Sequence, residues 1–158
     1  MSKISDDALE CFKRSLLEIM NETGFHEAQI DETGEDVNYS LLTTIGFTGR
    51  VHGYLMLQAD LPSANNFVKL LSEYIGMTDI EETFGDFHKS TFCEIVNQIS
   101  GRSTIHLSEM GLDSDITPPS IIIGSSIYSS ISDFDASKTF YIKDIFGTFK
   151  VFVGINIS

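Results

Sequence analysis

The hydrophobic residues of this chain change their spacing from one segment to the next, and the two kinds of spacing indicate two kinds of element. Residues 6–23 place apolar side chains three and four positions apart, which predicts an amphipathic helix with Asp6 and Asp7 near its start and Gly24 at its stop. Residues 149–157 instead alternate apolar with other side chains, which is the period of a β-strand. We therefore expect helices that pack on a sheet.

Two further helices are predicted in the middle of the chain. One opens at Asp60 and stops at Gly76, and five side chains at helical spacing form its packed face: Phe67, Leu70, Leu71, Tyr74 and Ile75. The other follows an acidic loop, begins near Asp86 and runs to about Met110. Both end at a glycine, the residue that most easily takes the left-handed conformation that closes a helix.

The β-runs complete a simple order of elements. They are residues 26–31, a hairpin over 39–59, and three later runs at 120–131, 138–145 and 148–157. The order is helix, three strands and helix, followed by helix and three strands, which gives two loosely similar halves without a convincing residue repeat. The predicted fold class is α+β, in which long helices cover one face of an antiparallel-rich sheet in a single domain over residues 5–158.

Charge and composition exclude several classes of function. The 158 residues include 23 acidic residues and 10 Lys and Arg, for a net charge of −13, so we expect no nucleic-acid partner, because the phosphate backbone is bound through cations. No apolar run approaches the ~20 residues that span a bilayer and the first residues are too polar for a signal peptide, so we expect a cytosolic protein. Cys11 and Cys93 lie in helical apolar patterns and the histidines are scattered, so we expect buried thiols and no metal site.

The third predicted helix carries the clearest chemical pattern. At about 100° per residue, its apolar side chains fall on one side: Phe92, Ile95, Val96 and Ile99. A narrow stripe falls on the other side: Ser90, Glu94, Asn97 and Gly101. A solvated helix face normally mixes lysine, glutamate and arginine. In this stripe a carboxylate and an amide stand between small residues, which let another surface approach closely.

The spacing Glu-x-x-Asn is a weak signal by itself, because the chain contains it three times, at Glu18/Asn21, Glu35/Asn38 and Glu94/Asn97. The pair at 35–38 lies in a polar loop and is attributed to chance. For Glu94 and Asn97 the structural alternative is a solvated pair that supports the helix by about 0.3 kcal/mol. The sequence around the pair is needed to weigh these interpretations.

Residues 90–124, STFCEIVNQISGRSTIHLSEMGLDSDITPPSIIIG, resemble the signature region of the CheC/CheX/FliY family of chemotaxis phosphatases. The family pattern is Asp or Ser, three residues, Glu, two residues, Asn and then a later proline, and Ser90, Glu94 and Asn97 match it. Gly101 and the stretch PP-x-I-I-x-G are most similar to CheX. A fainter similarity, to a glycine-containing hairpin followed by a helix, covers residues 44–67.

The resemblance implies a phosphatase that hydrolyses the aspartyl-phosphate of a CheY-like response-regulator receiver, in chemotaxis or related two-component signalling. It implies that Asn97 orients the attacking water, because an amide offers a donor and an acceptor without a repelling charge. Glu94 would pair with the lysine beside the phosphorylated aspartate. Ser90 and Gly101 are candidate binding residues. The alternative for Ser90 is a passive surface serine; Gly101 would serve close packing rather than chemistry, and its alternative is a simple compromise in the helix interior. No cofactor of the chain's own is implied, since Mg²⁺ is expected on the receiver.

Two features depart from the family pattern. Pro118 and Pro119 follow Asn97 at slightly less than the usual spacing, which leaves open which proline corresponds. In members with two sites the first helix carries another Glu/Asn pair, and Glu18 and Asn21 occupy that position. Arg14, however, stands where the family has Asp or Ser. We therefore keep Glu18 and Asn21 as a possible second site and expect one working site.

Two other functions are compatible with the resemblance. One is a non-catalytic receiver-binding or signalling adaptor module of the same fold. The other is a motor-associated module like the switch-complex members of the family. Those members carry extra targeting segments, and we expect that 158 residues leave no room for one. The similarity to CheX also implies a homodimer paired through sheet edges, and the long apolar C-terminal strand prompts that expectation.

Overall fold

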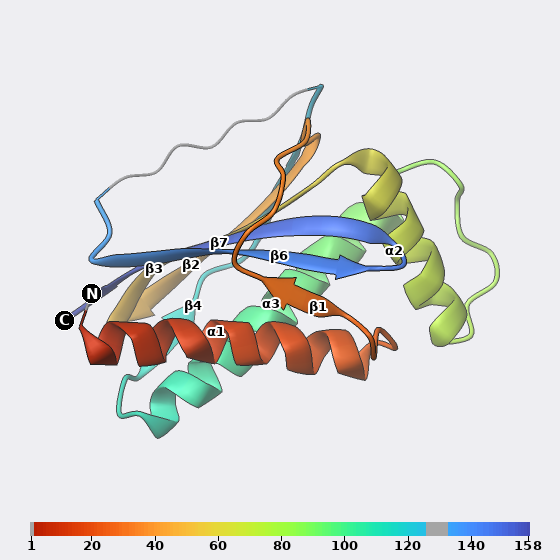
Figure 1. Cartoon of the computed structure of the whole chain (residues 1–158). Coiled ribbons are helices and arrows are strands. Elements are labelled where there is room, and N and C mark those ends of the chain that lie inside the picture. The colour runs from red at the N-terminus through yellow and green to blue at the C-terminus, as the bar shows by residue number, and fades with distance from the viewer. Residues whose placement is uncertain (1, 126–132) are drawn as a thin grey trace.

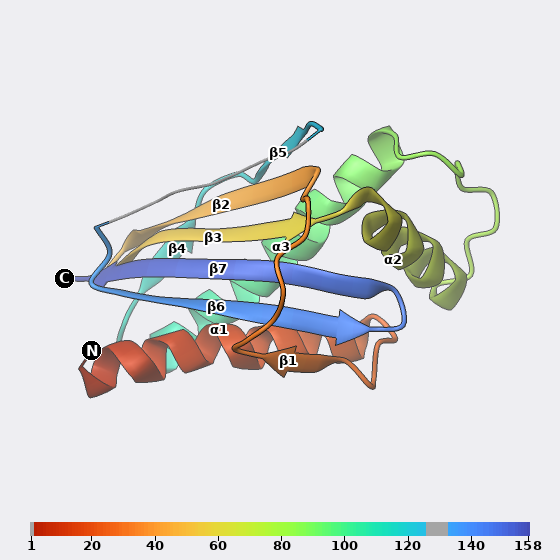
Figure 2. The same cartoon turned by 45° about the horizontal axis from the view of Figure 1, so that its top comes forward.

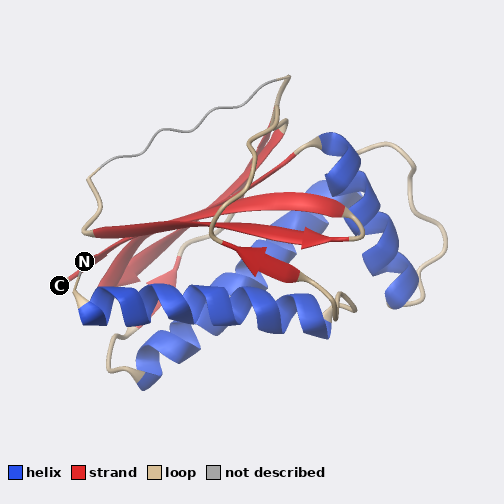
Figure 3. Cartoon of the chain, viewed as in Figure 1, coloured by secondary structure: helices blue, strands red, loops and turns tan. Residues whose placement is uncertain are grey.

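The computed structural model describes residues 2–125 and 133–158, which form three helices and a seven-stranded sheet (Figure 1). In chain order the elements are α1 (Lys3–Glu22), β1 (Gln29–Asp31), β2 (Leu41–Gly49), β3 (Val51–Ala59), α2 (Leu61–Tyr74), α3 (Asp86–Glu109), β4 (Ser114–Ile116), β5 (Ser120–Ile123), β6 (Ala136–Asp144) and β7 (Gly147–Ile157). Coloured by secondary structure, the chain shows one sheet layer and a separate helical layer (Figure 3). This is the predicted α+β class.

The sheet is antiparallel at each of its pairings, in the order β1-β6-β7-β3-β2-β4 (Figure 2). β5 also pairs with β2, so β4 and β5 share one edge of that strand: β4 pairs with residues 47–49 and β5 with residues 41–44. The C-terminal strand β7 lies between β6 and β3. The longest strand is therefore inside the sheet and not at its edge.

The core lies between the sheet and the helices. α1 and α3 cross one face of the sheet, and α2 packs against β7 and α3 near one end of the strands (Figures 1 and 2). The Phe67 ring of α2 lies 5.0–5.5 Å, centroid to centroid, from four other rings: Phe25, Phe92, Phe146 and Phe149. Aromatic pairs at such distances contribute beyond the area they bury. This cluster fixes the position of α2 relative to α3 and β7.

The opposite face of the sheet is crossed by the loop of residues 32–40 (Figure 2). Asp36 anchors this loop, because its Oδ1 accepts a hydrogen bond from the Tyr141 hydroxyl at 3.1 Å and lies 2.9 Å from Lys150 Nζ. The hydrogen bond from Lys150 is the main cause that lowers the pKa of Asp36. Burial, followed by the Asp36 charge, raises the pKa of Tyr39 to about 12.

The boundaries of some elements differ from the sequence prediction. α1 begins at Lys3 because Ser2 caps it through a hydrogen bond that its Oγ accepts from the backbone N–H of Ser5 at 3.2 Å. The run predicted at 26–31 is a strand only over β1. β4 is not predicted, since three residues are too few to show alternation. In the run predicted at 120–131, residues 120–123 form β5, and residues 126–132 lie outside the described part of the chain.

Three predictions about burial and edges are wrong. Tyr74 and Ile75 of the predicted packed face of α2 are exposed, because the helix ends at Tyr74 and runs past the core. Cys11 and Cys93 are only half-buried, and this partial burial raises the pKa of both thiols. β7 is paired on both sides, so it offers no edge to a second copy.

Candidate active site

α3 begins and ends at positions that its sequence defines. Gly85 precedes the helix in an extended conformation, and its N–H donates to His88 Nδ1 at 3.2 Å. At the other end Gly111 has a φ of +78°, and the Leu112 N–H closes the last turn on the Leu107 carbonyl at 2.9 Å. A left-handed residue at this place is the usual way to end a helix. The helix therefore carries residues 86–109 as one straight run past α1 and α2.

The two predicted sides of α3 are observed. The core side is fully or almost fully buried, as predicted: Phe92, Ile95, Val96 and Ile99. On the opposite side Ser90 and Glu94 are exposed, and Asn97 and Gly101 are partly exposed. We call these four residues the α3 stripe. The geometry required of a docking site on this helix is therefore present.

Glu94 and Asn97 are available to a partner. The Glu94 Oε1 accepts one hydrogen bond, from Gln98 Nε2 at 3.1 Å, and within residues 2–125 and 133–158 it forms no ion pair. In the same described residues the Asn97 amide has no hydrogen-bond partner. A carboxylate without a cation and an amide with a free donor and acceptor can bind an ammonium group and a water.

The surface at Gly101 is open. A Cβ built on this residue meets no heavy atom within 4 Å, apart from its own helix. Packing among the described residues therefore does not explain the glycine. A glycine in an exposed helix interior costs about 1 kcal/mol relative to alanine, so Gly101 is either a local compromise of the helix or a place where a second molecule can approach closely.

The matching pair on α1 is engaged within the chain. Glu18 Oε1 lies 2.5 Å from His106 Nε2, and the Glu18 carboxylate also lies 3.7 Å from Arg14 and 3.8 Å from Arg102. Asn21 Oδ1 lies 2.7 Å from His26 Nδ1. The possible second site at Glu18 and Asn21 thus presents groups that already bind α3 and the end of α1. Their arrangement supports packing of α1 on α3.

A groove of about 340 Å³ lies beside the α3 stripe, between the end of α2 and the first half of α3. Its apolar lining comes from both helices and the segment after α2: Leu71, Ile75, Met77, Phe87 and Ile95. Ser90 and Glu94 line it as well, so the groove and the α3 stripe share two residues. We call it the α2–α3 groove.

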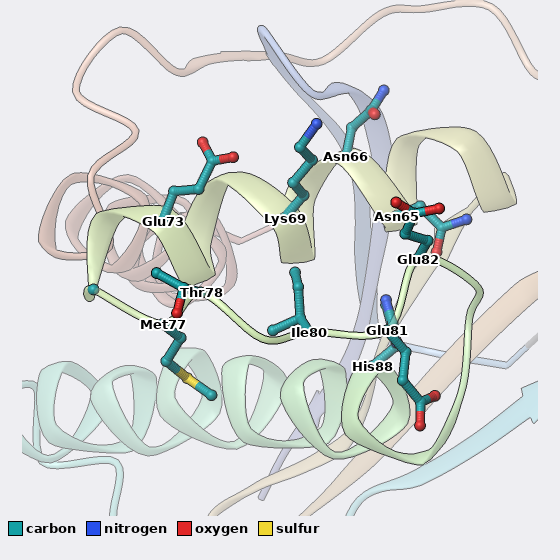
Figure 4. A pocket seen from close by; sticks show the side chains of 11 residues that line it. Asn65, Asn66, Lys69, Glu73, Met77, Thr78, Ile80, Glu81, Glu82 and His88 are labelled. Atoms are coloured by element: carbon teal, nitrogen blue, oxygen red, sulfur yellow. The ribbon is translucent and has the colours of Figure 1, made fainter.

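A second hollow, of about 600 Å³, lies on the other side of α2 (Figure 4). Its lining includes Asn65 and Lys69 of α2 and, from the segment that follows this helix, Ile80 and Glu82. None of the α3 stripe residues lines it. The size of a cavity therefore does not locate the candidate site in this fold.

Comparison with known proteins identifies the family. The family described as "Chemotaxis phosphatase CheX" matches residues 41–141, which is more than half of the chain and includes all of α3. The chain belongs to the CheX family. The protein of Thermotoga maritima named "CheY-P phosphatase CheX" is 27% identical over 92 residues, which span 58% of this chain and 57% of that protein. The match to this relative thus covers little more than half of its length.

Solved structures agree with the CheX-family assignment at the level of the fold. A CheC-like superfamily protein from Shewanella sp. PV-4 aligns with a TM-score of 0.80 at 16% identity, over 99% of each chain. The CheX–CheY–BeF₃–Mg²⁺ complex from Borrelia burgdorferi aligns with a TM-score of 0.75 at 19% identity, over 95% of this chain and 98% of that chain. Of the helices described here, none is both long and apolar enough to cross a membrane.

Sequence reasoning missed two parts of this site. Gln98, which hydrogen-bonds Glu94, lies one turn after it on the exposed side, and the (i, i+4) spacing was a signal for that contact. The α2–α3 groove had no such signal, because Leu71, Ile75 and Met77 belong to a helix end whose direction relative to α3 is set by tertiary packing.

Proposed function

We propose that this chain hydrolyses the aspartyl-phosphate of a CheY-like receiver domain, with Glu94 and Asn97 as its catalytic residues. The observation that carries the proposal is the pair itself. Among the described residues Glu94 forms no ion pair and Asn97 no side-chain hydrogen bond, and both lie on the solvent side of α3 in a chain of the CheX family. The Thermotoga relative is named for this activity, and the Borrelia complex contains CheX with CheY.

Asn97 would position the attacking water. In the reaction the water oxygen bonds to phosphorus, the bond between phosphorus and the aspartyl oxygen breaks, and both protons leave with the phosphate as dihydrogen phosphate. No group of this chain has to accept a proton. An acyl phosphate needs chiefly a water held in line with the breaking bond, and a neutral amide does this without repelling the phosphoryl oxygens.

Glu94 would fix the receiver on α3. A carboxylate beside a phosphoryl group is repulsive, but the same carboxylate attracts the lysine that receivers carry next to the phosphorylated aspartate. The hydrogen bond from Gln98 restrains the Glu94 side chain before the receiver arrives. Ser90 and Gly101 would complete the contact, as a hydrogen-bonding residue and as a place of close approach.

The chain is proposed to need no cofactor of its own. Mg²⁺ on the receiver neutralises charge at the phosphoryl group, so the contribution of this chain is geometry.

We further propose that the protein acts in the cytoplasm and as a homodimer. One edge strand that could pair with a second copy is β5, where Ile122 and Ile123 are exposed. A particle of 17.5 kDa by light scattering at micromolar concentrations would contradict the dimer.

The test of the function is phosphate release from a Mg²⁺-loaded phospho-receiver. Asn97→Ala should abolish the acceleration while the variant still binds the receiver, because a partly exposed amide contributes little to folding. Glu94→Ala should weaken binding by about 1–3 kcal/mol through the lost charge-assisted hydrogen bond. Asn21→Ala, the same substitution at the same spacing on α1, is the matched control and should keep wild-type turnover.

Two outcomes would contradict the proposal. Wild-type turnover by Asn97→Ala would show that the assigned mechanism is wrong. If the wild-type protein bound the phospho-receiver tightly but released no phosphate, the chain would be a receiver-binding adaptor.

A further inference from the structure

The α2–α3 groove is the most apolar hollow next to the α3 stripe. Its walls come from the last turns of α2, the residue pair after that helix, and the first half of α3. Two apolar side chains at its rim are strongly exposed, with Ile75 at 59% and Met77 at 41%. Among the described residues that line the groove, Glu94 is the one charged side chain.

We propose that the α2–α3 groove receives an apolar side chain of the docked receiver and so selects which receivers the phosphatase binds. This inference rests on the proposed function, because it assumes a receiver on the α3 stripe. The occupant is an aliphatic or aromatic side chain that the receiver carries close to its active-site lysine. The groove is a binding and specificity surface, and it takes no part in the hydrolysis.

Shared residues connect the groove to the docking site. Ser90 and Glu94 belong both to the α3 stripe and to the groove lining. A receiver whose lysine pairs with Glu94 must therefore extend over the mouth of the groove. If water still covered Ile75 and Met77 in that complex, the free energy gained by burying them would be lost. This gain is about 25 cal/mol per Å² of apolar surface.

The fold itself does not require these apolar side chains. Ile75 stands at the C-cap of α2, where its backbone N–H donates to the Leu71 carbonyl at 3.1 Å and its side chain lies mostly in solvent. A helix end of this kind accepts polar residues equally well. Exposed apolar side chains that gather around a hollow mark interaction surfaces more often than single ones do.

The groove chemistry favours an uncharged group. Apart from Glu94, its polar lining consists of hydroxyl and amide side chains: Thr23, Ser72, Ser90, Thr91 and Gln98. A second cation of the receiver would find only the Glu94 carboxylate, which the lysine already occupies in the proposed complex. An acidic side chain would be repelled by Glu94 and by the net charge of −13.

The experiment compares Ile75→Ser with a matched control, Ile145→Ser. Ile145 is 79% exposed, lies in the turn between β6 and β7 and is not among the residues that line the groove. Binding is measured by fluorescence anisotropy of a labelled receiver loaded with Mg²⁺ and beryllofluoride, and turnover by phosphate release. We expect Ile75→Ser to raise Kd and KM about tenfold with kcat unchanged, as for an apolar interface anchor, and Ile145→Ser to behave as wild type.

The outcomes separate this inference from the proposed function. Equal Kd values for Ile75→Ser and the wild type would overturn the groove assignment, and so would an equal loss in both serine variants. A change of particle mass for Ile75→Ser without a change in receiver affinity would show that a second copy of this chain covers the groove. Asn97→Ala in the same titration should bind as wild type. If it binds but also turns over, the catalytic role of Asn97 fails while the groove result still stands; if the wild type binds the receiver but releases no phosphate, the proposed function fails.

Discussion

Replacing Gly101 with Ala should change stability and activity in opposite directions. Gly101 lies inside α3, and a Cβ there meets no heavy atom within 4 Å outside its own helix, so the methyl group costs nothing in steric terms. Glycine is about 0.8–1.0 kcal/mol less favourable than alanine at such a position. For a chain of 158 residues this corresponds to a rise in Tm of about 2–4 °C.

The same methyl group should harm receiver binding. If the receiver approaches the bare backbone at Gly101, an added carbon overpacks the interface by about 1 kcal/mol or more, which raises KM roughly fivefold. The measurements are a thermal melt by circular dichroism and phosphate release as a function of receiver concentration. A variant that is stabilised and equally active would show that the receiver does not reach Gly101. A variant that is destabilised would refute the stability argument itself.

Two further predictions concern contacts away from the α3 stripe. Glu18→Ala should lower the free energy of unfolding by about 1–3 kcal/mol, because it removes the partner of the buried His106 Nε2. Phosphate release should stay at the wild-type rate. Normal stability with reduced turnover would instead indicate a second site on α1. The pKa of Tyr39 is raised from 10.0 to about 12, so its contribution to the stability of the fold is complete below pH 10 and is lost as the pH rises through about 12. Urea titrations between pH 9 and 12 should show a smaller loss of unfolding free energy for Tyr39→Phe than for the wild type. Equal losses would contradict the assignment.

The sequence allowed the helices to be predicted better than the sheet. α3 was predicted from Asp86 to about Met110, and it spans Asp86–Glu109, because a long run of helical spacing between two glycines is a strong local signal. The position of β7 in the middle of the sheet could not be predicted in the same way. Alternation shows which residues face the core, but the partners of a strand depend on contacts that are distant in sequence.

The exposed end of α2 could not be predicted either, because it also depends on contacts that are distant in sequence. Helical spacing places Tyr74 and Ile75 with Phe67 and Leu71 on one side of the helix. The core, however, stops at the aromatic cluster around Phe67, so the last turn projects beyond it. The spacing of apolar residues indicates the direction of a face, whereas the length of that face that becomes buried is decided by the neighbouring elements.

The two Glu/Asn pairs show how one spacing can serve two purposes. On α1, Glu18 contacts His106 and Arg102 of α3 and so joins the two helices, whereas Asn21 is bound to His26, just after α1. On α3, no basic side chain of the described chain lies next to Glu94, and Asn97 faces outward. The arginines decide the difference, because a carboxylate that already lies near Arg14 and Arg102 gains little from a lysine on a partner. Of these two glutamates, Glu94 is therefore the one that forms no ion pair among the described residues, and the contacts of Glu18 hold α1 against α3.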